Sequence, residues 1–277
     1  MQINILSGAL GAEILNFKLN AITQNNFEEL NSLLLEHKVI FFRDQNISSK
    51  ELMSLGSLFG PVEEHAYVKG LDDFPQITRI VKAANEKNQW GEGWHSDVSY
   101  DVKPCKTIIL RSIKIPPVGG DTVFSNMELA WETLDKDIKS IIENKNALHT
   151  SNGSKFFVED FSEMESNGNI GEKYSNEHPI VRTHPETGNK ILYVNPTYTK
   201  KIIGLPTKES DELLERIFRH QEKLDLSCRF KWTENAVAIL DNRCTQHYAI
   251  ADFYPGRGLG HERIMDRIAI VGDQPFK

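Results

Sequence analysis

Apolar residues follow two spacings along this chain, one typical of helices and one typical of strands. Apolar positions three or four residues apart predict helices over 26–37, 127–145 and 210–224. A capping box of Ser48 with Glu51 predicts a further short helix that ends near Gly60. Short apolar runs between turn residues predict many strands, the clearest over 38–42, 76–81, 107–113, 121–124, 180–183, 191–194, 226–232, 236–240 and 267–271.

Many short strands with few helices predict a mainly β protein, a barrel or jelly roll with flanking helices, rather than alternating βαβ units. The sequence has no visible repeat or linker, so we expect residues 1–277 to form a single domain. Residues 151–178 are rich in Ser, Asn, Gly and Glu and include Phe156 and Phe161. This segment predicts either a lid-like insertion or a surface excursion pinned to the core by its aromatic side chains.

Composition and charge narrow the classes of partner. With 39% hydrophobic and 26% charged residues the chain is typical of globular proteins, and its net charge of −7 argues against nucleic acid as a partner. The three cysteines have no C-x-x-C spacing, so neither a disulfide framework nor a thiolate zinc site is predicted. The first residues lack a basic region followed by an apolar run, and no stretch of about 18 apolar residues occurs. We therefore expect a cytoplasmic protein without a membrane partner; whether it forms a homo-oligomer is left open.

His95 and Asp97 are the first candidates for chemistry. On an extended backbone, side chains two positions apart leave from the same face and can converge on one point. A third ligand from His247 would complete a site of two histidines and one carboxylate, the arrangement of non-haem Fe(II) enzymes that use oxygen. The alternative is a surface loop in which Asp97 accepts a hydrogen bond from His95. The metal site requires a fold that brings His247 beside the other two residues, as a closed barrel can.

Arg263 and Arg267 are the second candidates, because residues four apart on a strand point the same way. An arginine that faces into a barrel is costly unless an anion meets it, and its planar fork suits a carboxylate or a sulfonate. The alternative is a pair of exposed arginines on an edge strand.

Several spaced motifs together resemble the taurine dioxygenase family of Fe(II)- and 2-oxoglutarate-dependent dioxygenases. The motifs occur in the family's order and span nearly the whole chain: His95-Ser96-Asp97, Gly119-Gly120-Asp121-Thr122, Val181-Arg182-Thr183-His184-Pro185, Tyr193-Val194-Asn195, Asp241-Asn242-Arg243-x-Thr245-x-His247 and Arg263-Ile264-Met265-x-Arg267. The resemblance implies a double-stranded β-helix, or cupin-like jelly roll, and an enzyme that uses Fe(II), 2-oxoglutarate and O2.

The resemblance also implies roles for individual residues. The iron ligands would be His95, Asp97 and His247, and Thr122 and Arg263 would bind the far carboxylate of 2-oxoglutarate. Substrate contacts would come from Arg267, His65, the backbone at Val98, Tyr198 and Phe156. Two positions depart from taurine dioxygenase itself: Glu92 stands in place of an Asn, and Val68 aligns with a family Tyr unless the register shifts to Tyr67. The segment between His247 and Arg263 is also longer.

The implied activity is hydroxylation of a small anionic substrate, a sulfonate such as taurine or a related compound, with succinate and CO2 as co-products. An oxygenase of the same superfamily could instead hydroxylate, desaturate or rearrange a carboxylate or a biosynthetic intermediate. From another class, a metal-bearing jelly-roll binding protein without turnover stays open. A zinc hydrolase would leave Thr122 and the two arginines unexplained.

Overall fold

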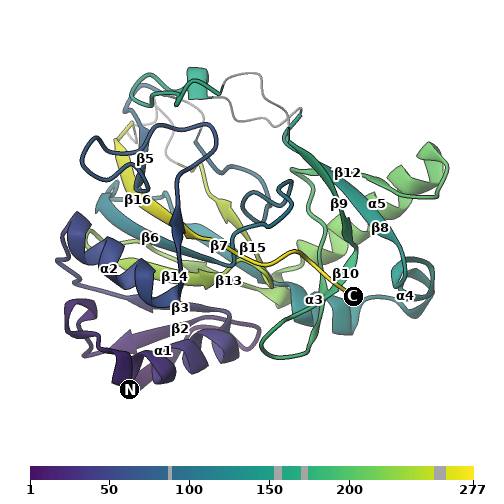
Figure 1. Cartoon of the computed structure of the whole chain (residues 1–277), viewed down its shortest axis with the longest axis horizontal. Coiled ribbons are helices and arrows are strands. Elements are labelled where there is room, and N and C mark those ends of the chain that lie inside the picture. Colours follow the sequence, from purple (N-terminus) through teal and green to yellow (C-terminus); the bar gives the residue numbers. More distant parts are fainter. Residues whose placement is uncertain (87–88, 153–157, 170–173, 253–259) are drawn as a thin grey trace.

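The computed structural model describes residues 1–86, 89–152, 158–169, 174–252 and 260–277 (Figure 1). In the described chain, one large sheet has the strand order β1-β2-β3-β14-β6-β16-β4, with β5 also paired to β16. These strands are β1 (Gln2–Ile5), β2 (Ala12–Leu15), β3 (Val39–Phe42), β14 (Val237–Asp241), β6 (Thr107–Lys114), β16 (Arg263–Ile270), β4 (Val62–Glu63) and β5 (Thr78–Lys82). The pairs are antiparallel except β2 with β3.

A smaller sheet packs against the large one and closes the jelly roll. Its order is β13-β7-β15, from β13 (Ser227–Phe230), β7 (Thr122–Asn126) and β15 (Thr245–Ala249). Phe41 on β3 stacks on Phe230 of β13 with ring centroids 4.0 Å apart and meets Phe124 of β7 edge-on at 5.4 Å. The predicted mainly β jelly roll with flanking helices is confirmed.

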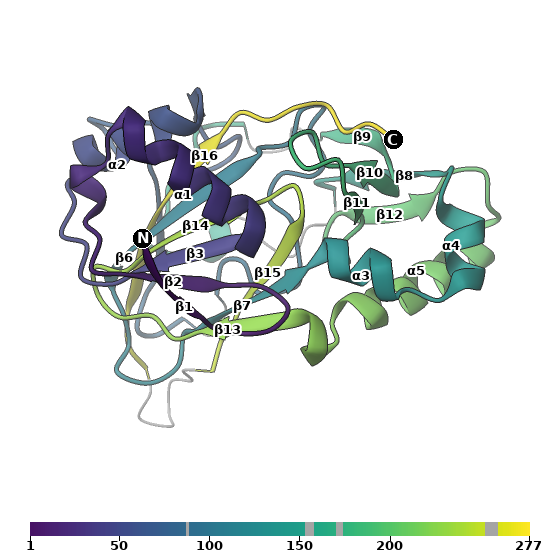
Figure 2. The same cartoon turned by 90° about the horizontal axis from the view of Figure 1, so that it is seen from below.

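Strand β3 is apolar at every position because the large sheet is covered on both faces. Val39 and Phe41 point into the core between the sheets, while Ile40 and Phe42 point into a second core. Helices α1 (Gln24–His37) and α2 (Ser49–Phe59) cover this second core, which contains Leu34 among other leucines (Figure 2). A sheet buried on both faces accounts for runs of apolar residues without alternation.

The capping box predicted from Ser48 and Glu51 is present. The Ser48 hydroxyl accepts from the Glu51 N–H at 3.2 Å, and the Glu51 carboxylate accepts from the Ser48 N–H at 2.7 Å. These bonds satisfy groups that the first turn of α2 would otherwise leave unpaired.

A third core lies at the opposite end of the molecule from α1 and α2 (Figures 1 and 2). It is formed by α3 (Met127–Thr133), α4 (Lys136–Ile142), α5 (Thr207–Gln221), the hairpin of β10 (Val181–Thr183) with β11 (Lys190–Leu192), and the sheet of β12 (Thr199–Ile202), β8 (Asn146–Thr150) and β9 (Ser175–Pro179). Short 3-10 helices occur at Leu19–Ala21, Val158–Asp160 and Leu224–Leu226.

Two predictions about elements are corrected. The predicted single helix over 127–145 is two helices. Leu134 between them is extended, with ψ 144°, and buries its side chain in the third core; Asp135 then caps α4, which begins at Lys136. The segment 151–178 is not wholly a loop, since Ser175–Pro179 pairs with β8 as β9. Its Phe161 is buried and contacts Trp90 with centroids 5.7 Å apart. Phe156 lies outside the described residues.

Candidate active site

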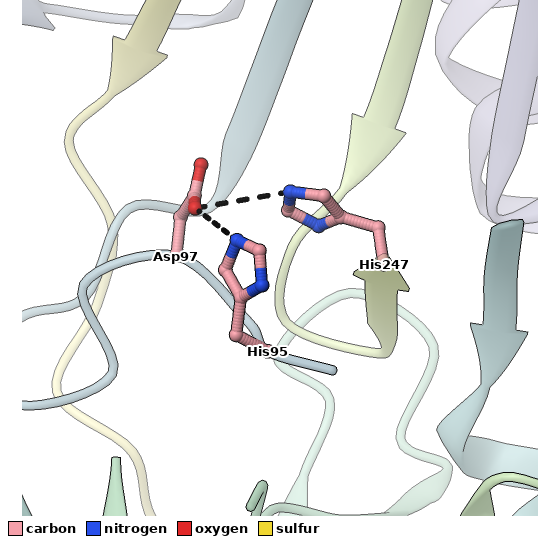
Figure 3. Close-up of side chains that lie close together, drawn as sticks. All are labelled: His95, Asp97 and His247. Atoms are coloured by element: carbon pink, nitrogen blue, oxygen red, sulfur yellow. Dashed lines mark ion pairs between the residues drawn. The ribbon is translucent and has the colours of Figure 1, made fainter. Parts of the chain in front are cut away.

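His95 and Asp97, from the irregular segment before β6, come together with His247 of β15 (Figure 3). Asp97 Oδ1 lies 3.2 Å from His95 Nε2 and 3.8 Å from His247 Nε2. One potential ligand atom from each residue lies within 4.8 Å of the others. Three metal ligands around one cation have this spacing. The fold therefore brings His247 beside His95 and Asp97, as the predicted metal site requires.

Backbone pairing explains why residues so distant in sequence meet. His247 lies on β15, and His95 pairs with it as an isolated antiparallel bridge. The His95 N–H donates to the His247 carbonyl at 3.2 Å, and the His247 N–H donates to the His95 carbonyl at 2.9 Å. The Ser96 hydroxyl adds a bond of 2.7 Å to the Thr245 carbonyl. The two imidazoles are therefore fixed relative to each other by main-chain bonds.

The tautomer of His95 fits metal binding. Its Nδ1 lies 2.7 Å from the Gly93 carbonyl, which can only accept, so Nδ1 carries the hydrogen. In the neutral ring Nε2 then directs a lone pair at the Asp97 carboxylate. Two acceptors that face each other at 3.2 Å are stabilised by a cation between them, and a second bond from the distal ring nitrogen is usual for metal-bound histidine.

The charges around Asp97 favour the ligand forms of these residues. Burial by itself would raise the pKa of Asp97, but the charge of Arg267 holds it well below its usual range. Burial, reinforced by His95, lowers the pKa of His247 to about 3. An ionised carboxylate beside a neutral imidazole is the state that binds a divalent metal at neutral pH.

Arg263 and Arg267 lie on one face of β16, together with Met265 in the core between the sheets. Both arginines are 5% exposed. Arg267 Nε donates to Asp97 Oδ2 at 2.9 Å, whereas Arg263 Nε donates to the Gly120 carbonyl at 3.1 Å. Arg263 forms no ion pair with any described residue, and burial lowers its pKa to about 10. The alternative of two exposed arginines on an edge strand is wrong.

Thr122 lies at the start of β7, two residues after the carbonyl that Arg263 contacts. Its hydroxyl oxygen accepts from Trp232 Nε1 at 2.9 Å. Because that bond occupies a lone pair, the hydroxyl hydrogen is free to be donated to another acceptor. The contact of Trp232 with Thr122 was not predicted from the sequence, because it depends on the pairing of β13 with β7.

His65 lies close enough to Arg267 and Asp97 for both charges to affect its pKa. Its Nδ1 accepts from the backbone N–H groups of Tyr67 and Val68, both at 3.1 Å. The neutral ring therefore carries its hydrogen on Nε2. Burial and the nearby Arg267 charge lower the pKa of His65 to about 3, so the ring is neutral and offers one donor.

Aromatic rings surround His95, Asp97 and His247, which we call the triad. Tyr198 meets His95 edge-on at 6.2 Å between centroids and contacts Tyr100 at 5.0 Å. Trp90 meets His65 at 6.0 Å, and Tyr67 contacts Tyr100 at 6.3 Å. Together these rings give the site a largely apolar wall. Trp90 was missed because a lone tryptophan in a polar stretch gives no periodic signal.

The other predicted substrate residues differ in their surroundings. Glu92 is partly buried and forms no ion pair with a described residue, and its N–H donates to the Gln89 carbonyl. Val98 is buried directly after Asp97, and its φ of 48° lies in the left-handed region that a β-branched residue rarely adopts. Phe156 lies outside the described residues.

A second cluster of potential ligands consists of His184, Asp241 and Cys244, all buried. Arg243 occupies the Asp241 carboxylate with two bonds of 2.9 and 2.6 Å, and His184 Nε2 lies 2.9 Å from the same carboxylate. Because a guanidinium already neutralises Asp241, this cluster is a structural ion-pair network rather than a metal site.

A jelly roll that brings two histidines and one carboxylate together has the donor set of non-haem iron oxygenases. Comparison with known proteins gives the same class. The family model "Taurine catabolism dioxygenase TauD, TfdA family" matches residues 2–268, and the chain belongs to this family.

Relatives agree over nearly the whole chain. It is 34% identical over 282 residues to "Alkylsulfatase" of Acinetobacter baylyi, covering 99% of this chain and 86% of that protein. It is 29% identical to "Alpha-ketoglutarate-dependent sulfate ester dioxygenase" of Pseudomonas putida, covering 99% of this chain and 91% of the relative. The crystal structure of a taurine dioxygenase from Burkholderia xenovorans matches with a TM-score of 0.84 and 32% identity, covering 99% of this chain and 90% of that one.

The family consists of non-haem iron dioxygenases that use Fe(II), 2-oxoglutarate and O2, and this chain is an enzyme of that class. The resemblance seen in the sequence is therefore confirmed. The relatives' names describe action on small anions: sulfonates, sulfate esters and an aryloxyacetate. None of the helices in the described ranges has the length and apolar character needed to cross a bilayer.

Proposed function

We propose that this enzyme hydroxylates a sulfonate or sulfate ester, with iron held by His95, Asp97 and His247. Arg263 and Thr122 bind the far carboxylate of 2-oxoglutarate, and Arg267 with His65 binds the anionic group of the substrate. The observation that carries the proposal is the pair of buried arginines on one face of β16, one of them against Asp97. Four residues of strand separate them by about 13 Å, so two different anions can be bound on either side of Met265.

The surroundings of Arg263 support a carboxylate ligand. Its charge is buried, and its bond to the Gly120 carbonyl leaves the two terminal nitrogens without a hydrogen-bond partner in the described chain. Asp121 is near enough to raise the pKa of Arg263 but forms no ion pair with it. A buried guanidinium that no carboxylate contacts is costly, and a carboxylate that accepts both terminal N–H groups removes that cost. The Thr122 hydroxyl, with its hydrogen free, supplies a further donor from the neighbouring strand.

The surroundings of Arg267 support a second anion close to the iron. Its Nε is used by Asp97, and its terminal nitrogens have no hydrogen-bond partner among the described residues. The Nε2–H of His65 adds a neutral donor in the same region. A sulfonate or sulfate head has three terminal oxygens and can accept from both side chains at once, while the aromatic wall of Trp90 and Tyr198 suits an apolar body.

The protein's contribution to the reaction is binding, orientation and exclusion of water. When bound, iron with 2-oxoglutarate and O2 supplies the oxidising power that breaks a substrate C–H bond and releases succinate and CO2. Arg267 and His65 hold the anionic head beside Asp97, so the carbon next to that head faces the triad. Hydroxylation of this carbon gives an unstable product that releases sulfite or sulfate and leaves an aldehyde. An amine-bearing substrate such as taurine would need a carboxylate partner, for which Glu92 is the candidate.

The test is succinate formation by the purified protein with Fe(II), ascorbate and 2-oxoglutarate. Four substrates with different head groups are compared: hexyl sulfate, hexanesulfonate, the amino-sulfonate taurine and the carboxylate heptanoate. We expect the sulfate or the sulfonate to give the highest rate, with no substrate-dependent succinate in His95→Ala. A highest rate with heptanoate would contradict the organosulfur substrate and favour a carboxylate. Equal rates in His95→Ala and the wild type would contradict the iron site.

A further inference from the structure

Asn242 holds the backbone of Asp97 through its side chain. The residue is completely buried in the turn between β14 and β15. Its Oδ1 accepts from the Asp97 N–H at 2.8 Å, and its Nδ2 donates to the Asp97 carbonyl at 3.0 Å and to the Cys105 carbonyl at 2.9 Å. Both main-chain polar groups of Asp97 are thus bound by one amide, as they would be by a neighbouring strand.

This amide clamp replaces a strand pairing that stops at Asp97. The bridge between His95 and His247, continued in register, would place Asp97 opposite Thr245. Instead, the Thr245 carbonyl accepts from the Ser96 hydroxyl, and Asp97 is bound by Asn242. The chain leaves the strand direction at this point, because the next residue, Val98, has a left-handed φ of 48°.

The Asp97 carboxylate meets His95 where the chain leaves the strand direction. Asp97 Oδ1 lies 3.2 Å from His95 Nε2, and the residue with the left-handed φ, Val98, comes next. Val98 is a β-branched residue in a strained conformation, which persists only when its surroundings impose it. The two bonds from Asn242 to the preceding peptide groups supply that constraint.

We propose that Asn242 is a positioning residue for the metal site: it aims the Asp97 carboxylate and thereby sets the affinity for the metal. The inference rests on the proposed iron site. Arg267 holds the other carboxylate oxygen through the side chain, so the backbone and the side chain of Asp97 are fixed by separate partners. The side-chain bonds of Asn242 go to Asp97 and Cys105, and its N–H donates to the Lys106 carbonyl at 2.9 Å. Among the described residues, none of its bonds goes to Arg263, Arg267 or His65.

The test is the dissociation constant for Mn(II) in the isosteric variant Asn242→Asp. The second carboxylate oxygen would face the carbonyls of Asp97 and Cys105, which cannot donate to it. We expect Mn(II) binding to weaken about 10- to 100-fold, the usual effect of losing a residue that orients a metal ligand. The matched control is Asn195→Asp, since Asn195 is also buried and its amide accepts from Tyr198 N–H at 2.8 Å and donates to Ser99 Oγ at 2.9 Å. We expect unchanged Mn(II) affinity in this control.

Folding is followed by circular dichroism, and Asn242→Ser is the second variant because it removes the amide without adding a charge. A folded Asn242 variant with wild-type Mn(II) affinity would overturn the proposal. So would failure of both variants to fold, because Asn242 would then act on the whole domain. An equal loss of affinity in Asn195→Asp would also overturn it. Failure of the proposed iron site would give a different result. In that case His95→Ala would bind Mn(II) as tightly as the wild type does, or neither protein would bind it.

Discussion

Two arginines four residues apart on β16 have opposite electrostatic surroundings. Arg267 lies against the Asp97 carboxylate, which together with Cys105 raises its pKa although burial lowers it. Among the described residues Arg263 donates only to a carbonyl, and burial lowers its pKa although the charge of Asp121 partly opposes this. The same side chain is therefore stabilising at one position and costly at the other until an anion binds. Such a cost is typical of residues kept for function rather than for stability.

We predict that Arg263→Met and Arg267→Met have opposite effects on the metal-free, ligand-free protein. Arg263→Met removes a desolvated charge and should raise the free energy of unfolding by about 1–3 kcal/mol. Arg267→Met leaves Asp97 without its partner and should lower it by a similar amount. Urea denaturation in the presence of EDTA measures both.

The same two variants should affect the KM of different compounds, one that of 2-oxoglutarate and the other that of the organic substrate. Arg263→Met should raise the KM for 2-oxoglutarate about 10- to 100-fold, as expected for loss of hydrogen bonds to a charged group. Arg267→Met should raise the KM for the organic substrate instead. Exchange of the two effects between the variants would contradict the assigned roles.

Asp101 gives the protein a stability that depends on pH. Burial, with a smaller effect of Glu63, raises its pKa from 3.8 to about 6 in the folded protein. The folded state therefore holds this proton more tightly than the unfolded state does. The resulting stability is complete below pH 3.8 and is lost as the pH rises through 6.

We predict that Asp101→Asn raises the free energy of unfolding at pH 7.5, where the wild-type carboxylate is charged and partly buried. After allowance for solvent screening, the gain should be roughly 1 kcal/mol, and it should shrink toward zero below pH 4. Denaturation at several pH values checks this, with the exposed Asp211→Asn on α5 as the control. A gain that is the same at every pH would contradict the raised pKa.

At the scale of elements, the chain just after β16 packs closely against the segment around Pro104, which follows Asp97 in the sequence. A Cβ added to Gly272 would lie 1.9 Å from the Pro104 carbonyl oxygen. The adjacent Val271 N–H donates to the Pro61 carbonyl at 2.9 Å, so the backbone cannot easily move away. The contact lies just past the end of β16, the strand that carries the two arginines and pairs with β6.

We predict that Gly272→Ala lowers the free energy of unfolding by about 1–3 kcal/mol, as overpacking against a rigid backbone usually does. Gly8→Ala is the control, because a Cβ there would meet no atom within 4 Å. Thermal denaturation of the two variants measures the difference. Equal melting temperatures would contradict the close fit at Gly272.

Elements that are buried on both faces were predictable from sequence, and polar strands were not. The apolar runs Val39–Phe42, 108–110 and 237–240 in β3, β6 and β14 carry their own signal, because successive side chains in them enter the cores on the two faces of the sheet. Strand β9, Ser-Asn-Glu-His-Pro, has no such signal and exists only through its pairing with β8. The break at Leu134 also depends on a tertiary contact, since the third core pulls its side chain inward.

At the scale of the whole molecule, the triad could be predicted because its members lie in motifs of fixed order. The residues that hold the triad could not. The ion pair of Arg267 with Asp97 joins positions 170 apart, and the bond from Asp97 to Asn242 joins positions 145 apart. Pattern and propensity act over a few residues, whereas such bonds depend on how the two sheets close around one point.

We propose that the metal ion lies between His95, Asp97 and His247 and not in the cluster of His184, Asp241 and Cys244. Mn(II) titration followed by electron paramagnetic resonance tests it most directly, because free and bound Mn(II) give different signals. We predict one tight site per chain in the wild type and in Cys244→Ala, and no tight site in folded His247→Ala. Retention of the site in His247→Ala, or its loss in Cys244→Ala, would contradict the account.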